Sequence, residues 1–462
     1  MALTDEQVAR LTEQRFAATR PVATRHPIDA ADLPPGLRWP GFLQSVGLLR
    51  FRHRFVPWMQ RRFGDVFTVR LIPGNQPLVL FARPEHAKEI FAGDPEVFHA
   101  GKGNAILGPI MGEHSLLLQD SGEHKRARKL LMPAFNGAAL RGYRELVTGL
   151  ARDEAANWTP GREFRSLDRM NALTLEVILR VVFGVTDETR LAQLRPRVNR
   201  TVNISPAILL GWGWPWLQRF GPWKAQVENQ RALDRLMYAE IGERRAAPDL
   251  AERTDVLSRL ISTGITEGDA LTDAELRDQL VTLLLAGHET TATALAWALH
   301  ELGRDPAQLA KARTAADDGD DAWLEAVMKE SMRLHPVIPM VVRTLQAPAT
   351  VGGIDLPAGV TIGPSIILAH RREQNHPEPD AFRPERFLDG PHHGGPPPNT
   401  WIPFGGGVRR CIGAGFSLME GVAVLREVLV RWDVTAVGDD EPKVRNITSV
   451  PRRGARIRVT PR

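Results

Sequence analysis

The order of hydrophobic patterns along the chain predicts a mainly α-helical protein with a small β-rich lobe. Residues 65–71 and 77–82 alternate between apolar and polar side chains and are separated by a proline–glycine–asparagine turn, which is typical of two paired strands. Pro84 is suited to the first turn of a helix, and helical periodicity dominates from there to about residue 335. Strand-like segments return at residues 350–361 and near the C-terminus.

The chain of 462 residues is longer than most single domains, which hold roughly 150 residues. It contains no internal repeat, and we expect a single domain over residues 41–462. Residues 1–40 are expected to form an irregular N-terminal arm, because the prolines at its end favour an extended lead-in to the domain.

Composition limits the class of protein. The formal net charge is +5, and acidic residues are spread along the chain without a basic segment that interleaves with aromatics, which argues against nucleic-acid binding. The single cysteine excludes an intrachain disulfide and is compatible with a reducing cytosol. Residues 1–25 lack an apolar signal segment, and no run of about 18–20 apolar residues could cross a bilayer. We therefore expect a cytoplasmic protein without a membrane anchor.

The only cysteine, Cys411, lies in the glycine-rich segment 404–413, two residues after Arg409. Glycine is needed where a backbone must come close to a ligand. The apolar periodicity that follows Gly413 predicts a helix, whose N-terminal dipole would favour a thiolate beside it. A lone cysteine is usually a small buried hydrophobe, but these neighbours are unsuited to a core position.

A long helix is predicted from Thr272 to Gly303. Thr272 and Glu275 form a capping box at its start, and Gly303 with Pro306 ends it. Its middle, residues 286–291, reads Ala-Gly-His-Glu-Thr-Thr between apolar flanks. This polar segment is either a solvent-facing patch or a buried functional one, and the apolar flanks favour the second reading.

A third group of charged residues lies further along. Glu330 and Arg333 are three residues apart and share a helix face, and Arg386 follows in the segment 382–387. Such pairs are commonly solvated, but a glutamate between two arginines can be buried when it is fully hydrogen-bonded.

These segments resemble the signatures of the cytochrome P-450 family. Residues 404–413 are similar to its cysteine-loop signature, whose fixed positions are filled by Phe404, Gly407, Arg409, Cys411 and Gly413. Residues 286–291 resemble its oxygen-activation motif, residues 330–333 its Glu-x-x-Arg motif, and Arg386 the arginine of its meander loop. The resemblance extends over roughly residues 40–460 and implies the prism-like fold of the family.

The resemblance also implies a cofactor and roles for individual residues. It implies haem b with Cys411 as the ligand of its iron, and Glu289 and Thr290 as the residues that deliver protons during oxygen activation. Phe404 would shield the sulfur, and Glu330, Arg333 and Arg386 would hold the scaffold of the cysteine loop. The remaining residues expected to contact the haem are His124, Arg128, Ala286, Gly287, Arg343, Gly405, Arg409 and Gly413.

The activity implied is that of a monooxygenase, which uses O₂ to hydroxylate or epoxidise a small molecule. The sequence holds no second cysteine for an iron–sulfur cluster, so electrons are expected from a separate ferredoxin or flavodoxin with its reductase. Lys125, Lys129 and Arg410 are the basic residues expected to meet an acidic partner.

The residues expected to line the substrate pocket are apolar, which favours a lipid, terpenoid or polyketide-like substrate over a sugar. They are Ile106, Ile110, Val337, Ile338, Met340 and Val341. The tryptophan-rich segment 212–223 is either a lid over that pocket or an ordinary buried turn.

Other readings of the same residues carry less weight. His288 could be a second haem ligand, and an enzyme of this kind could use peroxide in place of O₂, although the pair Glu289–Thr290 favours O₂. Cys411 could be the nucleophile of a hydrolase, but its neighbours offer no general base. A glycine-rich phosphate site would need a third glycine after Gly413 and Gly415.

Overall fold

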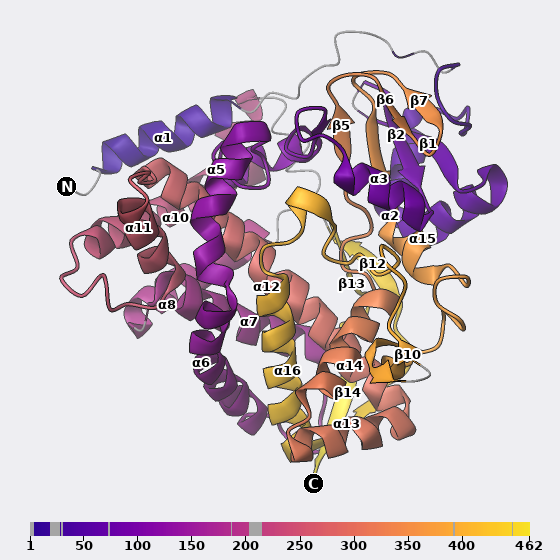
Figure 1. The fold of residues 1–462 in the computed structure, drawn as a ribbon. Helices are drawn as coiled ribbons and strands as arrows, with labels where there is room; N and C mark the ends of the chain where they lie inside the picture. Colours follow the sequence, from indigo (N-terminus) through magenta and orange to yellow (C-terminus); the bar gives the residue numbers. More distant parts are fainter. Residues whose placement is uncertain are drawn as a thin grey trace. The chain divides into compact units, whose positions relative to one another are not determined.

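A computed structural model of the chain describes residues 4–18, 28, 31–72, 74–185, 187–202, 215–390, 393–445 and 447–462. Helices make up most of it (Figure 1). They are α1 (Asp5–Ala18), α2 (Gly41–Phe63), α3 (Pro84–Ala92), α4 (Gly108–Met111), α5 (Ser121–Leu131), α6 (Gly137–Ala156), α7 (Ser166–Phe183), α8 (Glu188–Val202), α10 (Gly221–Arg245), α11 (Val256–Thr266), α12 (Asp273–Arg304), α13 (Pro306–Asp318), α14 (Asp321–Leu334), α15 (Ile366–Arg371) and α16 (Ala414–Arg431). Within these described ranges, no helix is both long enough and apolar enough to span a membrane.

Strands are short and gather in small sheets. They are β1 (Val66–Leu71), β2 (Gln76–Phe81), β3 (Phe98–His99), β4 (Glu163–Arg165), β5 (Arg343–Leu345), β6 (Ala349–Val351), β7 (Ile354–Leu356), β8 (Thr361–Pro364), β9 (Asp389–Gly390), β10 (His393–Gly394), β11 (Trp432–Ala436), β12 (Pro442–Arg445), β13 (Thr448–Pro451) and β14 (Arg456–Pro461). The largest sheet has the order β1-β2-β8-β5-β3, in which β2 and β8 are parallel and the other neighbours antiparallel. The predicted class, mainly helical with a small β-rich lobe, is confirmed.

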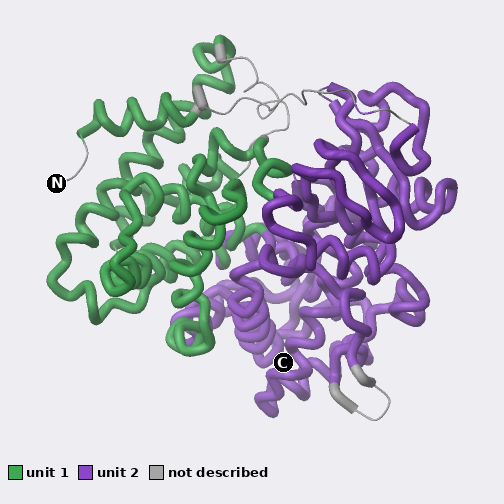
Figure 2. The backbone as a smooth tube through the Cα atoms, turned by 45° about the horizontal axis from the view of Figure 1, so that its top comes forward, with its two compact units in different colours: residues 1–22, 100–143, 174–289 green, residues 23–99, 144–173, 290–462 purple. Residues whose placement is uncertain are grey.

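The chain divides into two compact units (Figure 2). Unit 1 comprises residues 1–22, 100–143 and 174–289, and unit 2 comprises residues 23–99, 144–173 and 290–462. Helix α12 belongs to both, because the division falls between Glu289 and Thr290.

The main sheet of unit 2 is covered by apolar side chains on both faces. Phe67 and Leu80 pack with Val56 and Met59 of α2 on one face, and Phe81 packs in a cluster on the other. This follows from the period-two alternation that predicted β1 and β2, since successive side chains of a strand point to opposite faces. The alternating pattern in the sequence therefore positioned these strands correctly.

The N-terminal arm is less irregular than expected. Residues 5–18 form helix α1, in which Val8 and Thr12 are buried one turn apart. The Thr12 hydroxyl donates to Asp234 of α10 at 2.7 Å, and Arg15 contacts the same carboxyl at 2.8 Å. The expectation of an irregular segment was wrong for these residues, because a buried carboxylate on α10 gives the polar face of α1 a partner. Of the arm residues that the structure describes, 31–40, which include the prolines, lack a helix.

Helix α12 begins as the sequence predicts. The backbone N–H of Thr272 donates to the Glu275 carboxyl at 2.8 Å, and the N–H of Glu275 donates to the Thr272 hydroxyl at 3.2 Å. This reciprocal pair satisfies two N–H groups that a helix start leaves without intrahelical partners. The helix then runs without interruption to Arg304, so the segment 286–291 lies in its middle.

Candidate functional site

Cys411 closes a tight loop in unit 2. Its backbone N–H donates to the carbonyl of Phe404 at 2.8 Å, and within the loop Arg410 N–H donates to the carbonyl of Gly407 at 3.1 Å. The side chain of Cys411 is exposed. The sequence therefore folds so that its only thiol is presented outward from a hydrogen-bonded loop.

Two glycines let this loop pass over α3. A Cβ atom on Gly406 would lie 2.3 Å from the ring of Phe91, and one on Gly407 would lie 2.0 Å from the Phe91 carbonyl oxygen. Gly407 also has a φ of +62°, which glycine adopts without strain. Side chains at these positions would lift the loop away from α3 and move Cys411.

Helix α16 begins immediately after the cysteine. Its first residue is Ala414, and its N-cap Gly413 supplies no side-chain cap. A Cβ atom on Gly413 would meet nothing within 4 Å. The N–H groups of a first turn carry partial positive charge, so an anionic sulfur is favoured at this place. The exposed thiol of Cys411, the space beside Gly413 and the start of α16 together fit a planar group that is bound through sulfur and packs against the loop.

The middle of α12 exposes a small face. Ala286 is exposed, and Leu285, Gly287 and Thr290 are half-buried, whereas residues 280–284 and 291–302 are buried. Glu289 is buried. Gly287 has no room for a side chain, since a Cβ atom there would lie 2.7 Å from Ile178. Ala286 and Gly287 therefore leave one face of the helix without large side chains, next to the Glu289 carboxyl and the Thr290 hydroxyl.

His288 is held away from that face. Its Nδ1 lies 3.0 Å from the carbonyl oxygen of Leu284, and its own carbonyl accepts from the Thr174 hydroxyl at 2.9 Å. The side chain is buried. These contacts give His288 a structural role within unit 1 and weigh against the reading in which it binds a metal.

Glu330 lies between two arginines in the core of unit 2. Arg333 donates to both of its carboxyl oxygens at 2.6 and 2.9 Å, and Arg386 donates at 3.1 Å. Arg383 N–H adds a further bond at 2.8 Å. Arg333 also donates to the carbonyl oxygens of His370, Pro379 and Ala381. The cluster ties α14 to the segment that leads toward the cysteine loop.

Four of the residues expected to contact the haem carry cationic or N–H groups, and they are divided between the units. In unit 1, His124 is buried and Arg128 half-buried, one turn apart on α5. In unit 2, Arg343 is buried at the start of β5, with its guanidinium 6.0 Å from the centre of the Phe91 ring, and Arg409 is half-buried in the cysteine loop. Guanidinium and imidazole N–H groups can bind an anionic ligand through charge-assisted hydrogen bonds.

The expected pocket residues lie in two places. Ile110 is buried on α4 in unit 1. Val337 is buried and Ile338, Met340 and Val341 are partly buried in the segment before β5, all in unit 2. The side chain of Ile106 and residues 203–214, which include the first three residues of the tryptophan-rich segment 212–223, lie outside the described residues.

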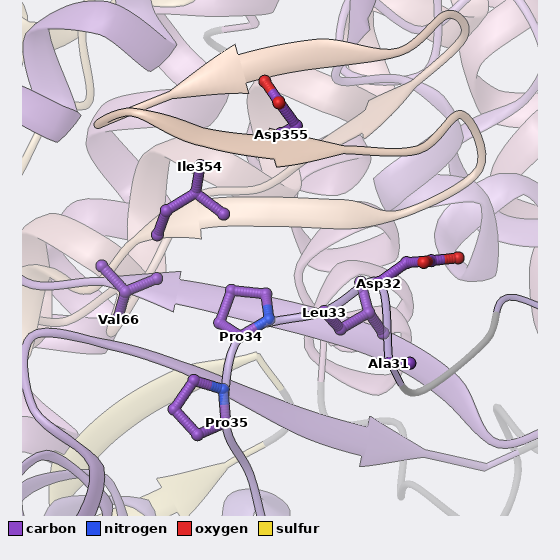
Figure 3. Close-up of a pocket in the computed structure, with 8 residues that line it drawn as sticks. All are labelled: Ala31, Asp32, Leu33, Pro34, Pro35, Val66, Ile354 and Asp355. Carbon is purple, nitrogen blue, oxygen red and sulfur yellow. The ribbon is translucent and has the colours of Figure 1, made fainter.

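A depression of about 420 Å³ lies in unit 2 between the proline-rich lead-in and β7 (Figure 3). Pro34, Val66 and Ile354 face one another there, and its charged side chains are Asp32 and Asp355. It contains no thiol and no base beside a nucleophile. We therefore assign it no part in the chemistry.

One buried acid was not predicted. Glu420, on α16 nine residues after Cys411, is buried, and burial raises its pKa to about 8, an effect that the nearby Thr291 hydroxyl offsets only in part. Thr291 in turn donates to the hydroxyl of Ser417 at 3.1 Å. In the sequence Glu420 is a single glutamate within an apolar helical segment. Such a residue is expected to face solvent, so the sequence alone does not identify it as buried.

The chain is similar to known proteins over nearly its whole length. A family model described as cytochrome P-450 matches residues 33–459. The curated protein named cytochrome P-450 135A1 of Mycobacterium tuberculosis is 55% identical over 432 residues, which cover 93% of this chain and 95% of that protein. Cytochrome P-450 135B1 of Mycobacterium bovis is 43% identical over 435 residues, which cover 92% and 91%.

A solved structure titled retinoic acid bound cyanobacterial CYP120A1 has a TM-score of 0.81 with 24% sequence identity. The match covers 93% of this chain and 99% of that one. At this level of identity the likeness shows the fold.

Proposed function

This chain belongs to the cytochrome P-450 family, so it is a haem-dependent monooxygenase, and we propose that Cys411 is the axial ligand of its iron. The observation that carries the proposal is the cysteine loop itself. Its only thiol faces outward beside the uncapped start of α16, and two glycines hold the loop against α3. Thiolate ligation supplies electron density that favours cleavage of the O–O bond.

Several other residues would hold the cofactor, which we propose is haem b. His124, Arg128, Arg343 and Arg409 offer cationic or hydrogen-bonding groups for its propionates. Ala286, Gly287, Phe404, Gly405 and Gly413 are small or flat residues that allow a planar ring to approach the backbone. Two observations support these roles: the face of α12 at Ala286 and Gly287 carries no large side chain, and no atom lies within 4 Å of a Cβ placed on Gly413.

The visible spectrum of the reduced protein with carbon monoxide tests the ligand. Wild type should show the red-shifted Soret band of thiolate ligation, and Cys411→Ala should lose it. Ser417→Ala, a change of similar size six residues later in α16, serves as the matched control and should keep the band. A band that survives in Cys411→Ala but is lost in His288→Ala would overturn the assignment.

Glu289 and Thr290 are proposed to hold and move protons during O₂ reduction. A relay needs an acid and a hydroxyl on adjacent turns or positions, and both lie in the small-residue segment of α12. Glu289→Gln and Thr290→Ala should lower the amount of product per reductant consumed, while reductant consumption persists.

Thr293→Ala, a buried threonine on the same helix, is the control and should leave the ratio of product to reductant unchanged. An unchanged ratio in both Glu289→Gln and Thr290→Ala would contradict the relay.

We propose an apolar substrate of the lipid, terpenoid or polyketide-like class. Support comes from Ile110, Val337, Ile338, Met340 and Val341, which are all apolar. The solved relative is bound to retinoic acid, a molecule of this general character. Titration with long-chain acids and terpenoids, followed by the shift of the Soret band, tests the class; a response only to sugars would contradict it.

Electrons are proposed to come from a separate ferredoxin or flavodoxin with its reductase. Lys125 is exposed on α5, whereas Lys129 on the same helix is partly neutralised by an ion pair with Glu267. Lys125→Glu should therefore slow ferredoxin-driven turnover in a salt-dependent manner, because charge complementarity mainly sets the association rate. Lys443→Glu, an exposed lysine in unit 2, is the control, and equal rates for the two variants would contradict this docking site.

A further inference from the structure

The first half of helix α2 has its polarity inverted. Gln44 and Ser45 are buried and hold the backbone of the neighbouring strand, with Arg70 N–H donating to Gln44 Oε1 at 3.0 Å and Ile72 N–H donating to Ser45 Oγ at 3.0 Å. Four of the five exposed side chains in residues 41–50 are apolar. Phe42, Leu43, Val46 and Leu49 are 54%, 44%, 50% and 52% exposed. A surface helix normally has the opposite arrangement.

Neighbouring residues enlarge this surface, which we call the α2 apolar face. It consists of Trp39, Phe42, Leu43, Val46, Leu49, Phe51 and Ile72. These are seven of the fifteen large apolar side chains that are exposed in the described part of the chain, so nearly half of them gather at one end of one helix. In Figure 1 α2 lies beside β1 and β2 of the same unit. Contiguous exposed apolar surface marks an interaction site.

The face is held in a fixed orientation. Besides the two bonds to the strand, the Gln44 amide donates to the carbonyl oxygens of Trp39 and Leu37 at 2.7 and 3.2 Å. A Cβ atom on Gly47 would lie 2.9 Å from the ring of Phe55, so the first half of the helix packs closely on the second. The helix bends at Phe51, whose φ is −128°. The apolar side chains are thus presented by an anchored element.

Positive charge surrounds the apolar face. Residues 33–64 contain six arginines and no aspartate or glutamate. Arg38 precedes the helix and Arg50 is its tenth residue; both are exposed, and neither makes an ion pair among the residues that the structure describes. Arg54, one turn further on, is paired with Glu441. The part of the surface nearest the apolar side chains therefore carries uncompensated positive charge.

We propose that the α2 apolar face docks on the surface of a lipid bilayer that contains anionic lipids. An apolar helix face with tryptophan and arginine at its margin is the composition of helices that lie in the membrane interface. Arg38 and Arg50 would meet the phosphate groups, and the long arginine stems allow the apolar side chains to enter the acyl region. This inference is independent of the proposed ligand and substrate.

Flotation of the full-length haem-loaded protein with vesicles tests the proposal. The protein should float with vesicles of phosphatidylcholine and phosphatidylglycerol, and salt should weaken this binding. It should float poorly with phosphatidylcholine alone. The variant Phe42→Ser/Val46→Ser/Leu49→Ser should bind at least about tenfold more weakly. Arg38→Glu/Arg50→Glu should lose about fivefold or more, on anionic vesicles only.

A matched control changes equally exposed apolar residues elsewhere. Leu146→Ser/Ile265→Ser/Val430→Ser should bind as wild type does. The spectrum with carbon monoxide reports whether each variant is folded. Wild-type binding by the serine variant of α2, or no flotation of wild type, would overturn the proposal. A wild-type dimer that this same variant converts to a monomer would also overturn it, since a second copy would then cover the face.

Discussion

Two buried glutamates on neighbouring helices of unit 2 have opposite surroundings. Glu330 on α14 accepts four hydrogen bonds. Two come from the Arg333 guanidinium at 2.6 and 2.9 Å, one from Arg386 at 3.1 Å and one from the Arg383 backbone N–H at 2.8 Å.

Glu420 on α16 is as deeply buried, but its neighbours are the hydroxyl groups of Thr291 and Ser417, and burial raises the pKa of Glu420 to about 8.

The difference shows how partners decide the charge of a buried acid. Glu330 faces two guanidinium groups that compensate a carboxylate. Among the residues that the structure describes, no cation pairs with Glu420, and this acid keeps its proton at neutral pH. The two helices pack closely, since a Cβ atom on Gly421 would lie 2.6 Å from the side chain of Met328. Helix α16 directly follows the cysteine loop, and α14 is bonded to the segment that leads toward that loop.

The largest expected effect comes from removing the compensated charge. Glu330→Gln leaves Arg333 and Arg386 buried without their carboxylate, and unfolding should become easier by about 3–5 kcal/mol. Urea unfolding of the haem-loaded protein measures this.

Glu325→Gln provides the control for that measurement, because Glu325 lies on the same helix in a half-exposed pair with Lys329. Its effect should stay below about 1 kcal/mol. Equal losses for the two variants would mean that the Glu330 cluster contributes no more than a surface pair.

The second prediction concerns pH. The pKa of Glu420 is about 8 in the folded chain against an ordinary value of 4.5, so the folded state binds the proton more tightly. The stability that this proton contributes is therefore fully present below the ordinary pKa of 4.5 and is lost as pH rises through the folded-state pKa of about 8. Between pH 6 and pH 8, wild type should lose about 2 kcal/mol relative to Glu420→Gln, which cannot ionise.

Unfolding of the two proteins in parallel at both pH values measures this difference. Parallel curves, with the same change for wild type and Glu420→Gln, would show that Glu420 is ionised at neutral pH or does not titrate in this range.

The smallest effect concerns how the two helices begin. The Asp320 carboxyl accepts from the N–H groups of Ala322 and Trp323 at the start of α14, whereas Gly413 gives α16 no side-chain cap. Asp320→Ala should destabilise the protein by about 1 kcal/mol. Asp318→Ala, an exposed acid two residues earlier, should change the thermal midpoint little, and an equal effect of both changes would argue against the cap.

The sequence allowed β1, β2 and the course of α12 to be predicted, because apolar periodicity and the Thr272–Glu275 capping box are local signals. It did not reveal α1. That helix depends on Asp234, more than two hundred residues away, which binds Thr12 and Arg15. Contacts of this kind are set by the fold and leave no local pattern.

The candidate site shows the same division. Motifs identified Cys411, Glu289 and Glu330, because each lies in a segment with fixed spacing. Glu420 was missed, since a glutamate in a helix usually faces solvent and its burial depends on Thr291 from another helix. The inverted polarity of α2 was missed as well, because its apolar residues fit a helix that buries them.

The most direct test of the central claim uses the fact that Cys411 is the only cysteine. Growth on cysteine with a heavy sulfur isotope, with unlabelled methionine supplied, marks a single thiol in the protein. The iron–sulfur stretching band in the resonance Raman spectrum should then move to lower frequency. A band that is present but does not move, or no such band in a haem-loaded protein, would contradict ligation by Cys411.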